Sequence, residues 1–84
     1  MIRYTVVWHL EARDELAEIW TDSEDRSAVA AAADLIDRQL AADAVEKGLE
    51  LSEGLRALFV PPLRVLFAVR EDDRLVEVLW VRLL

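Results

Sequence analysis

The sequence predicts an α+β domain in which two helices pack on one face of a mainly antiparallel sheet. Its 84 residues suffice for one hydrophobic core and are too few for two. A β-branched and aromatic run opens the chain, helical periodicity follows to about residue 47, and alternating apolar runs fill residues 55–83. The expected order over residues 1–84, taken as a single domain, is therefore strand, helix, helix and three strands.

Residues 3–20 change from strand to helix character. Threonine, valine and aromatic residues dominate the run 3–8, and such side chains favour extended backbone. From Glu11 onward, apolar positions recur at helical spacing, with acidic residues on the opposite face. These positions are Ala12, Leu16, Ile19 and Trp20. We expect this first helix to bury its apolar stripe against the sheet.

A second, longer helix is predicted after a polar break at residues 21–24. Thr21 followed by Glu24 has the form of a capping box, and Ser23 is the alternative N-cap. The helical pattern then continues to about Lys47. The two helices should therefore be joined by a very short connection.

The interior and the end of the second helix carry small residues. Ala28 and the run Ala30 to Ala33 would let another helix approach closely, which favours an antiparallel helical hairpin. Gly48 is well placed as the C′ residue that ends the helix. Residues 50–54 are then expected to form a connection to the sheet.

Three strands are predicted in the C-terminal third, at residues 55–60, 63–70 and 74–83. Pro61-Pro62 separates the first two, and the acidic residues 71–73 supply a tight turn between the last two. Alternation along the strands then assigns their faces. The two helices should pack on the sheet residues Val65, Phe67, Val78 and Trp80 through the side chains of Leu16, Ile19, Trp20, Ile36 and Leu40. The opposite, exposed face should carry Leu66, Ala68, Leu75, Leu79 and Val81.

That exposed face is apolar where an antiparallel sheet is usually polar, and contiguous apolar patches often mark an interface. We therefore expect a partner chain to cover it. The alternative is that the N-terminal strand or a loop covers part of it.

Composition excludes several classes of site. No cysteine is present, which removes disulfides and thiolate chemistry and favours a reducing compartment. No apolar run approaches the ~20 residues that cross a bilayer, so a cytoplasmic protein without a membrane partner is expected. Asp34 and Asp37 lie one helical turn apart without further ligands in a metal-binding pattern. We expect neither a metal nor a cofactor.

Charge is divided unevenly along the chain, whose net charge is −7. Residues 1–53 hold five bases and thirteen acids, whereas residues 54–84 hold five bases and four acids. A surface that attracts phosphate groups is therefore expected only in the C-terminal third.

Three segments carry a resemblance to a known family: residues 11–20, EARDELAEIW, residues 62–69, PLRVLFAV, and residues 76–82, VEVLWVR. In that order, they are similar to the first helix, the central strand and the final strand of the RelE/ParE toxins of type II toxin–antitoxin pairs. The resemblance spans nearly the whole chain. It implies a bacterial protein that inhibits growth and is neutralised by an antitoxin peptide wrapped around it.

The resemblance also implies two modes of action. Ribosome-dependent members cleave messenger RNA without a metal, using basic residues and often a C-terminal tyrosine, whereas ParE-like members inhibit DNA gyrase. By position, Arg64 corresponds to the central-strand arginine of the RNases and Arg82 to a terminal basic residue, so both are candidate catalytic residues. Tyr4 is the only tyrosine and Lys47 the only lysine, and neither lies at the family's positions. A ParE-like or non-catalytic mode is favoured. The alternatives are a ribosome-dependent endoribonuclease, or an inactive toxin-fold module that binds a partner or forms a homodimer.

Other candidate residues have structural interpretations. Arg64 is expected either to bind phosphate or to pair with Glu77 on the next strand. His9 is the only histidine, and no carboxylate is placed near it by sequence spacing, so a junction residue is favoured over a general base. The three tryptophans are expected in the core or an interface.

Overall fold

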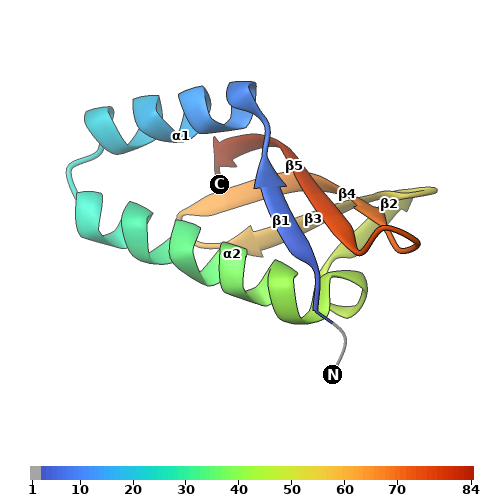
Figure 1. The fold of residues 1–84 in the computed structure, drawn as a ribbon. Coiled ribbons are helices and arrows are strands. Elements are labelled where there is room, and N and C mark those ends of the chain that lie inside the picture. Colours follow the sequence, from blue (N-terminus) through green and yellow to red (C-terminus); the bar gives the residue numbers. More distant parts are fainter. Residues whose placement is uncertain (1–2) are drawn as a thin grey trace.

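The computed structural model describes residues 3–84, which form two helices and a five-stranded sheet (Figure 1). The predicted α+β class is confirmed. The elements are β1 (Thr5–Trp8), α1 (Leu10–Asp22), α2 (Arg26–Lys47), β2 (Leu49–Ser52), β3 (Leu55–Val60), β4 (Leu63–Arg70) and β5 (Leu75–Leu83).

The strand order is β1-β5-β4-β3-β2, and β1 is parallel to β5 while the other neighbours are antiparallel. Main-chain N–H groups of Thr5 and His9 donate to the carbonyls of Arg74 and Val78, which fixes the first strand beside the last. The strand β2 was not expected, because residues 50–54 were predicted to be a connection. The segment LELS is short and alternates apolar with polar residues, but all four of its residues are exposed, so it adds an edge strand without contributing to the core.

The junction of the two helices differs from the predicted caps. Helix α1 continues through Thr21 to Asp22, and the N-cap of α2 is Asp25, whose side chain accepts a hydrogen bond from the Ala28 N–H. Arg26 then donates to the main-chain carbonyls of Trp20 and Thr21. Because carbonyls at a helix C-terminus lack partners within the helix, this arginine stabilises the end of α1.

Gly48 ends α2 as predicted, with an extended backbone (φ −90°, ψ 153°) that any residue can adopt. Glycine is required there for packing instead. A Cβ at this position would overlap Cζ of Phe67 and lie 3.0 Å from Cβ of Arg56. The start of β2 thus passes directly over the ring of a fully buried phenylalanine.

The last strand contains a β-bulge that reverses its side-chain alternation. Phe67 pairs with Val78 and Leu66 pairs with Trp80, so Leu79 is an additional residue without a partner on β4. A bulge places the residues after it on the opposite faces from those that strict alternation predicts. The predicted faces of Trp80 and Val81 were therefore wrong. Val81 is 1% exposed and belongs to the core, whereas Trp80 pairs with Leu66 on the other face.

Both helices contribute to one core on the same face of the sheet, in agreement with the predicted layers. The fully buried side chains include Ile36 and Leu40 of α2, Val65 and Phe67 of β4, and Val78 of β5. Leu16 and Ile19 of α1 are partly buried against this cluster. Trp20 was predicted to join this core, but 43% of its surface is exposed, so this prediction was wrong.

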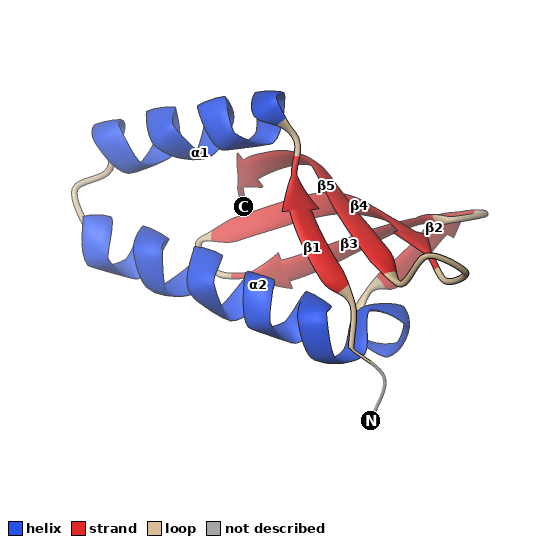
Figure 2. Cartoon of the chain, viewed as in Figure 1, coloured by secondary structure: helices blue, strands red, loops and turns tan. Residues whose placement is uncertain are grey.

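The helices do not form a closely packed hairpin. Figure 2 shows them joined at one end and diverging toward the other, with strands of the sheet visible between them. Helix α1 lies along β5, where Ala12 is fully buried and Glu15 accepts a hydrogen bond from the Val81 N–H at 3.2 Å. Strand β1 ends opposite Val78, so α1 covers the edge of β5 beyond that point. Between residues 3 and 84, no helix combines the length and apolar character needed to cross a membrane.

Candidate functional site

The two arginines singled out from the sequence lie together on the sheet face that points away from the helices. Arg64 of β4 and Arg82 of β5 are direct partners in the antiparallel register. Their guanidinium carbons lie 5.7 Å and 4.2 Å from the centre of the Trp80 ring. The bulge at Leu79 is responsible, because strict alternation would have placed Arg82 on the core face.

Arg64 and Arg82 belong to a row of cationic and aromatic side chains that can bind an anion. Phe59, opposite Arg64 on β3, is 50% exposed and extends the row of aromatic and cationic side chains across three strands. The Nε of Arg64 donates to the carbonyl of Leu83 at 3.2 Å, which limits the directions that its guanidinium can take. Guanidinium groups bind phosphates or carboxylates and stack on aromatic rings, but they remain protonated and cannot act as bases. The row can hold an anion, and it contains no proton acceptor for catalysis.

A second charged group on this face was not found from the sequence. Glu77 accepts hydrogen bonds from His9 Nε2 at 2.8 Å and from Arg70 Nε at 2.7 Å. Its side chain is 20% exposed. These hydrogen bonds, that from His9 foremost, lower the pKa of Glu77. Glu77 thus pairs with Arg70 and not with Arg64. His9 and Glu77 are 68 residues apart, and only the parallel pairing of β1 with β5 brings them together.

The predicted partner-binding patch is only partly on the surface. Leu66, Ala68, Leu75 and Leu79 are half-buried, while Val81 lies in the core and cannot take part. Two residues missed from the sequence belong to the same face, because they pair with residues already assigned to it. These are Val7, opposite Glu77 and 40% exposed, and Phe59, opposite Arg64.

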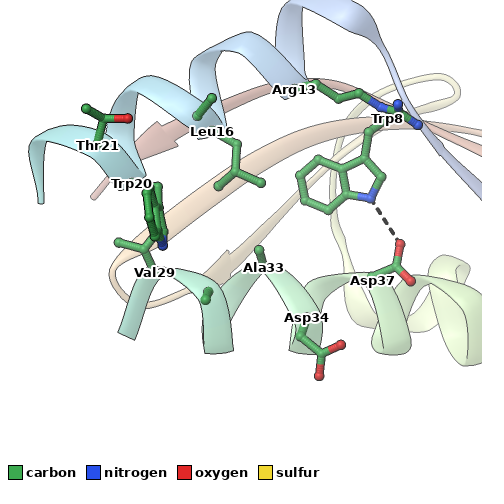
Figure 3. A pocket seen from close by; sticks show the side chains of 11 residues that line it. Trp8, Arg13, Leu16, Trp20, Thr21, Val29, Ala33, Asp34 and Asp37 are labelled. Carbon is green, nitrogen blue, oxygen red and sulfur yellow. Dashed lines mark hydrogen bonds between the residues drawn. The ribbon is translucent and has the colours of Figure 1, made fainter. Parts of the chain in front are cut away.

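The diverging helices leave a groove of about 760 Å³ between them (Figure 3). Its lining is mainly apolar and comes from β1, α1 and α2: Trp8, Arg13, Leu16, Ala17, Trp20, Thr21, Val29, Ala30, Ala33, Asp34 and Asp37. The indole N–H of Trp8 donates to Asp37 Oδ1 at 3.0 Å, which holds that ring between the helices. Sequence reasoning did not find this groove, because amphipathic patterns report which faces are apolar and not how far apart two helices lie.

Comparisons with known proteins give matches to solved structures only, since neither a family model nor a curated protein matches the sequence. The RelBE2 toxin–antitoxin complex from Mycobacterium tuberculosis matches with a TM-score of 0.81 at 22% identity, over 100% of this chain and 94% of that chain. The chromosomal ParDE system from P. aeruginosa matches with a TM-score of 0.71 at 18% identity, over 100% and 99%. An archaeal RelE–RelB complex from Pyrococcus horikoshii OT3 matches with a TM-score of 0.61 at 16% identity, over 99% and 96%. The chain has a RelE/ParE-type toxin fold.

Proposed function

We propose that this chain is the toxin-like subunit of a type II toxin–antitoxin pair, acting in the cytoplasm and neutralised by an antitoxin protein. The observation that carries the proposal is the extent of the structural match. It covers both helices and the whole sheet, and the matched structures are toxin–antitoxin complexes of both RelBE and ParDE type. A half-buried apolar sheet face and an apolar groove also offer two surfaces on which a wrapped partner would bury area.

We favour a ParE-like or non-catalytic mode, because in the described part of the chain neither the histidine nor the tyrosine lies beside the arginine pair. The only histidine, His9, is hydrogen-bonded to Glu77. Arg64 instead pairs with Arg82, which lies five residues after Glu77 on β5. The only tyrosine, Tyr4, packs against the core. General acid–base catalysis needs a titratable group within hydrogen-bond reach of the reacting proton. A protein that binds and blocks a target such as DNA gyrase needs no such group.

The second candidate is a ribosome-dependent, metal-independent endoribonuclease. The convergence of Arg64 and Arg82 over Trp80 favours it, since two guanidinium groups on an open face would stabilise a phosphate in its transition state. Ribosome-bound messenger RNA incubated with purified protein distinguishes the candidates. Under the favoured mode the RNA survives. Cleavage at defined codon positions that is lost in Arg64→Ala, and kept in the helix-surface control Arg38→Ala, would promote the endoribonuclease.

Co-expression tests the proposed function itself. Bacteria that express the chain should stop growing, and co-expression of a cognate antitoxin should restore growth and yield a complex that purifies as one species. Supercoiling of plasmid DNA, measured in the arrested cells, should fall if gyrase is the target. Growth that is unaffected by the folded protein would favour the third possibility, an inactive partner-binding or homodimeric module.

A further inference from the structure

Two rows of side chains cross the sheet on the face that points away from the helices. The apolar row follows the register of four neighbouring strands and consists of Leu49, Ala57, Leu66 and Trp80. The arginine row lies two residues away along β3, β4 and β5 and consists of Phe59, Arg64 and Arg82. At about 4.8 Å per strand spacing the apolar row is about 14 Å long, which matches about ten residues of an α-helix. The rows lie about 7 Å apart, so one helix about 10 Å in diameter would cover both.

Both rows are open in the folded chain. The two helices pack on the opposite face of the sheet (Figure 2). Leu49 and Phe59 are 61% and 50% exposed, and Leu66 and Trp80 are half-buried. Contiguous apolar surface of this kind is unfavourable in water, so its burial against a partner would stabilise a complex.

The arginine row lacks the carboxylates that other arginines of the chain have. Arg38, Arg56 and Arg70 each pair with an acidic side chain. Within residues 3–84, neither Arg64 nor Arg82 forms such an ion pair. The Nε of Arg64 donates to a main-chain carbonyl, which leaves its two terminal nitrogens for another acceptor. Two neighbouring guanidinium groups repel each other, and a carboxylate bound between them would offset this repulsion.

Three acidic residues around β5 do not supply that carboxylate. Glu77 is held by hydrogen bonds from two other side chains, and Glu15 accepts one from a main-chain N–H of β5. Glu18 lines a hollow with Arg82, but the two form no ion pair in the described part of the chain. Together with the net charge of −7, these acids oppose the approach of a polyanion, whereas a peptide with one or two carboxylates matches two guanidinium groups.

Protein side chains suit this face better than nucleotide bases do. The ring of Trp80 already has the guanidinium of Arg82 over it, 4.2 Å from the ring centre. The other three members of the apolar row are aliphatic, so Phe59 is the one open aromatic ring in the two rows. Single-stranded nucleic acids are bound by positively charged grooves that present a series of aromatic rings for stacking. The rows therefore favour a peptide as the ligand.

We propose that this sheet face binds an acidic amphipathic helix of a partner protein, with aliphatic side chains on the apolar row and one or two carboxylates between Arg64 and Arg82. The proposal deepens the proposed function, on which it rests for the statement that a partner protein covers this face. Burial of Leu49 and Leu66 would supply affinity. The carboxylates would set the orientation of the helix across the strands, because the arginine row lies on one side of the apolar row.

Two designed helical peptides of about 18 residues test the proposal. They share one stripe of leucine and alanine, and beside it they carry either a pair of glutamates or a pair of glutamines, which have similar helix propensities. Fluorescence anisotropy of the labelled peptides reports binding to the full chain. The glutamate peptide should bind at least about tenfold more tightly than the glutamine peptide, with the difference shrinking at high salt.

Two matched pairs of variants place the binding on the two rows. Arg82→Gln and Arg38→Gln each remove one positive charge, the first from the arginine row and the second from the exposed surface of α2. Arg82→Gln should reduce the preference for the glutamate peptide to less than about threefold, and Arg38→Gln should leave it near tenfold. Leu49→Gln should weaken both peptides by about threefold or more, whereas Leu35→Gln, at an exposed leucine of α2, should weaken neither. Circular dichroism checks that all four variants fold.

Three results would overturn the proposal: equal binding of both peptides, no binding of either, or an equal effect of the two arginine variants. A labelled single-stranded RNA of about 12 nucleotides should bind more weakly than the glutamate peptide. Tighter RNA binding that Arg82→Gln removes would assign the face to phosphate groups instead. Sedimentation that shows a dimer dissociated by Leu49→Gln would assign it to a second copy.

The peptide assay and the growth assay fail separately. Growth arrest by the chain does not depend on the designed peptides, so a failed peptide result leaves the arrest intact. If the chain does not arrest growth, the preference for the glutamate peptide still reports the chemistry of this face.

Discussion

Replacing Gly48 by alanine should destabilise the domain even though the backbone there suits any residue. Its dihedral angles, φ −90° and ψ 153°, lie in the extended region. At such a position, glycine to alanine usually stabilises by about 0.4–1 kcal/mol, because it restricts the unfolded chain. Here the added methyl group would overlap Cζ of Phe67 and lie 3.0 Å from both Phe67 Cε1 and Arg56 Cβ.

The size of the effect follows from the packing around Phe67. Carbon atoms rest at about 3.5–4.0 Å from one another, so the tip of the ring must retreat by on the order of 1 Å. Phe67 is fully buried, and a close-packed interior offers little room for that shift. Overpacking of this kind costs about 1–3 kcal/mol, which leaves a net loss of about 1–2 kcal/mol.

Urea unfolding followed by circular dichroism measures the change in the free energy of unfolding. The same substitution in a Phe67→Leu background should cost less, because leucine lacks the tip of the ring, and the double-mutant cycle isolates this coupling. A Gly48→Ala protein at least as stable as the wild type would refute the steric explanation. So would an equal loss in the two backgrounds.

Three other substitutions test the core, the charged group and the sheet face. Phe67→Ala should lower the free energy of unfolding by about 3–5 kcal/mol, and a loss below about 1 kcal/mol would contradict its central place in the core. Hydrogen bonds from His9 and Arg70 lower the pKa of Glu77 in the folded protein. The ionised Glu77 carboxylate therefore stabilises the fold above about pH 4.3, the pKa of glutamate in an unfolded chain. This stabilisation is lost as the pH falls through the lowered pKa of Glu77 in the folded state. Glu77→Gln should therefore be less stable than the wild type near neutral pH and converge with it in acid, whereas a pH-independent difference would mean that the carboxylate charge is not involved. Changing Leu66 and Leu79 together to lysine should preserve the fold and weaken the antitoxin complex in calorimetry, and unchanged affinity would remove this sheet face from the interface.

Regular patterns in the sequence were sufficient for the layers and for every helix and strand except β2. The stripe on α2 and the alternation along β4 correctly placed Ile36, Leu40, Val65 and Phe67 in the core, because both periods persist without interruption. Strand β5 shows where this reasoning ends. Nothing in an unbroken apolar run marks Leu79 as a bulge, and one additional residue was enough to reverse the faces of Trp80 and Val81.

The candidate site depended on information that no local pattern contains. Arg64 and Arg82 were named by resemblance, but the bulge decided that they share a face. The contact between His9 and Glu77 depends on where β1 enters the sheet. Hydrophobic periodicity likewise does not report the angle between two helices. The groove therefore became visible only in the three-dimensional structure.

Viable counts after induced expression in bacteria test the central claim most directly. Cells that express the wild-type chain should stop forming colonies, while cells that express the destabilised Phe67→Ala variant at matched levels should continue to do so. Colony numbers that remain equal, with the wild-type protein soluble and folded in the same cells, would contradict the assignment of this chain as a toxin-like subunit.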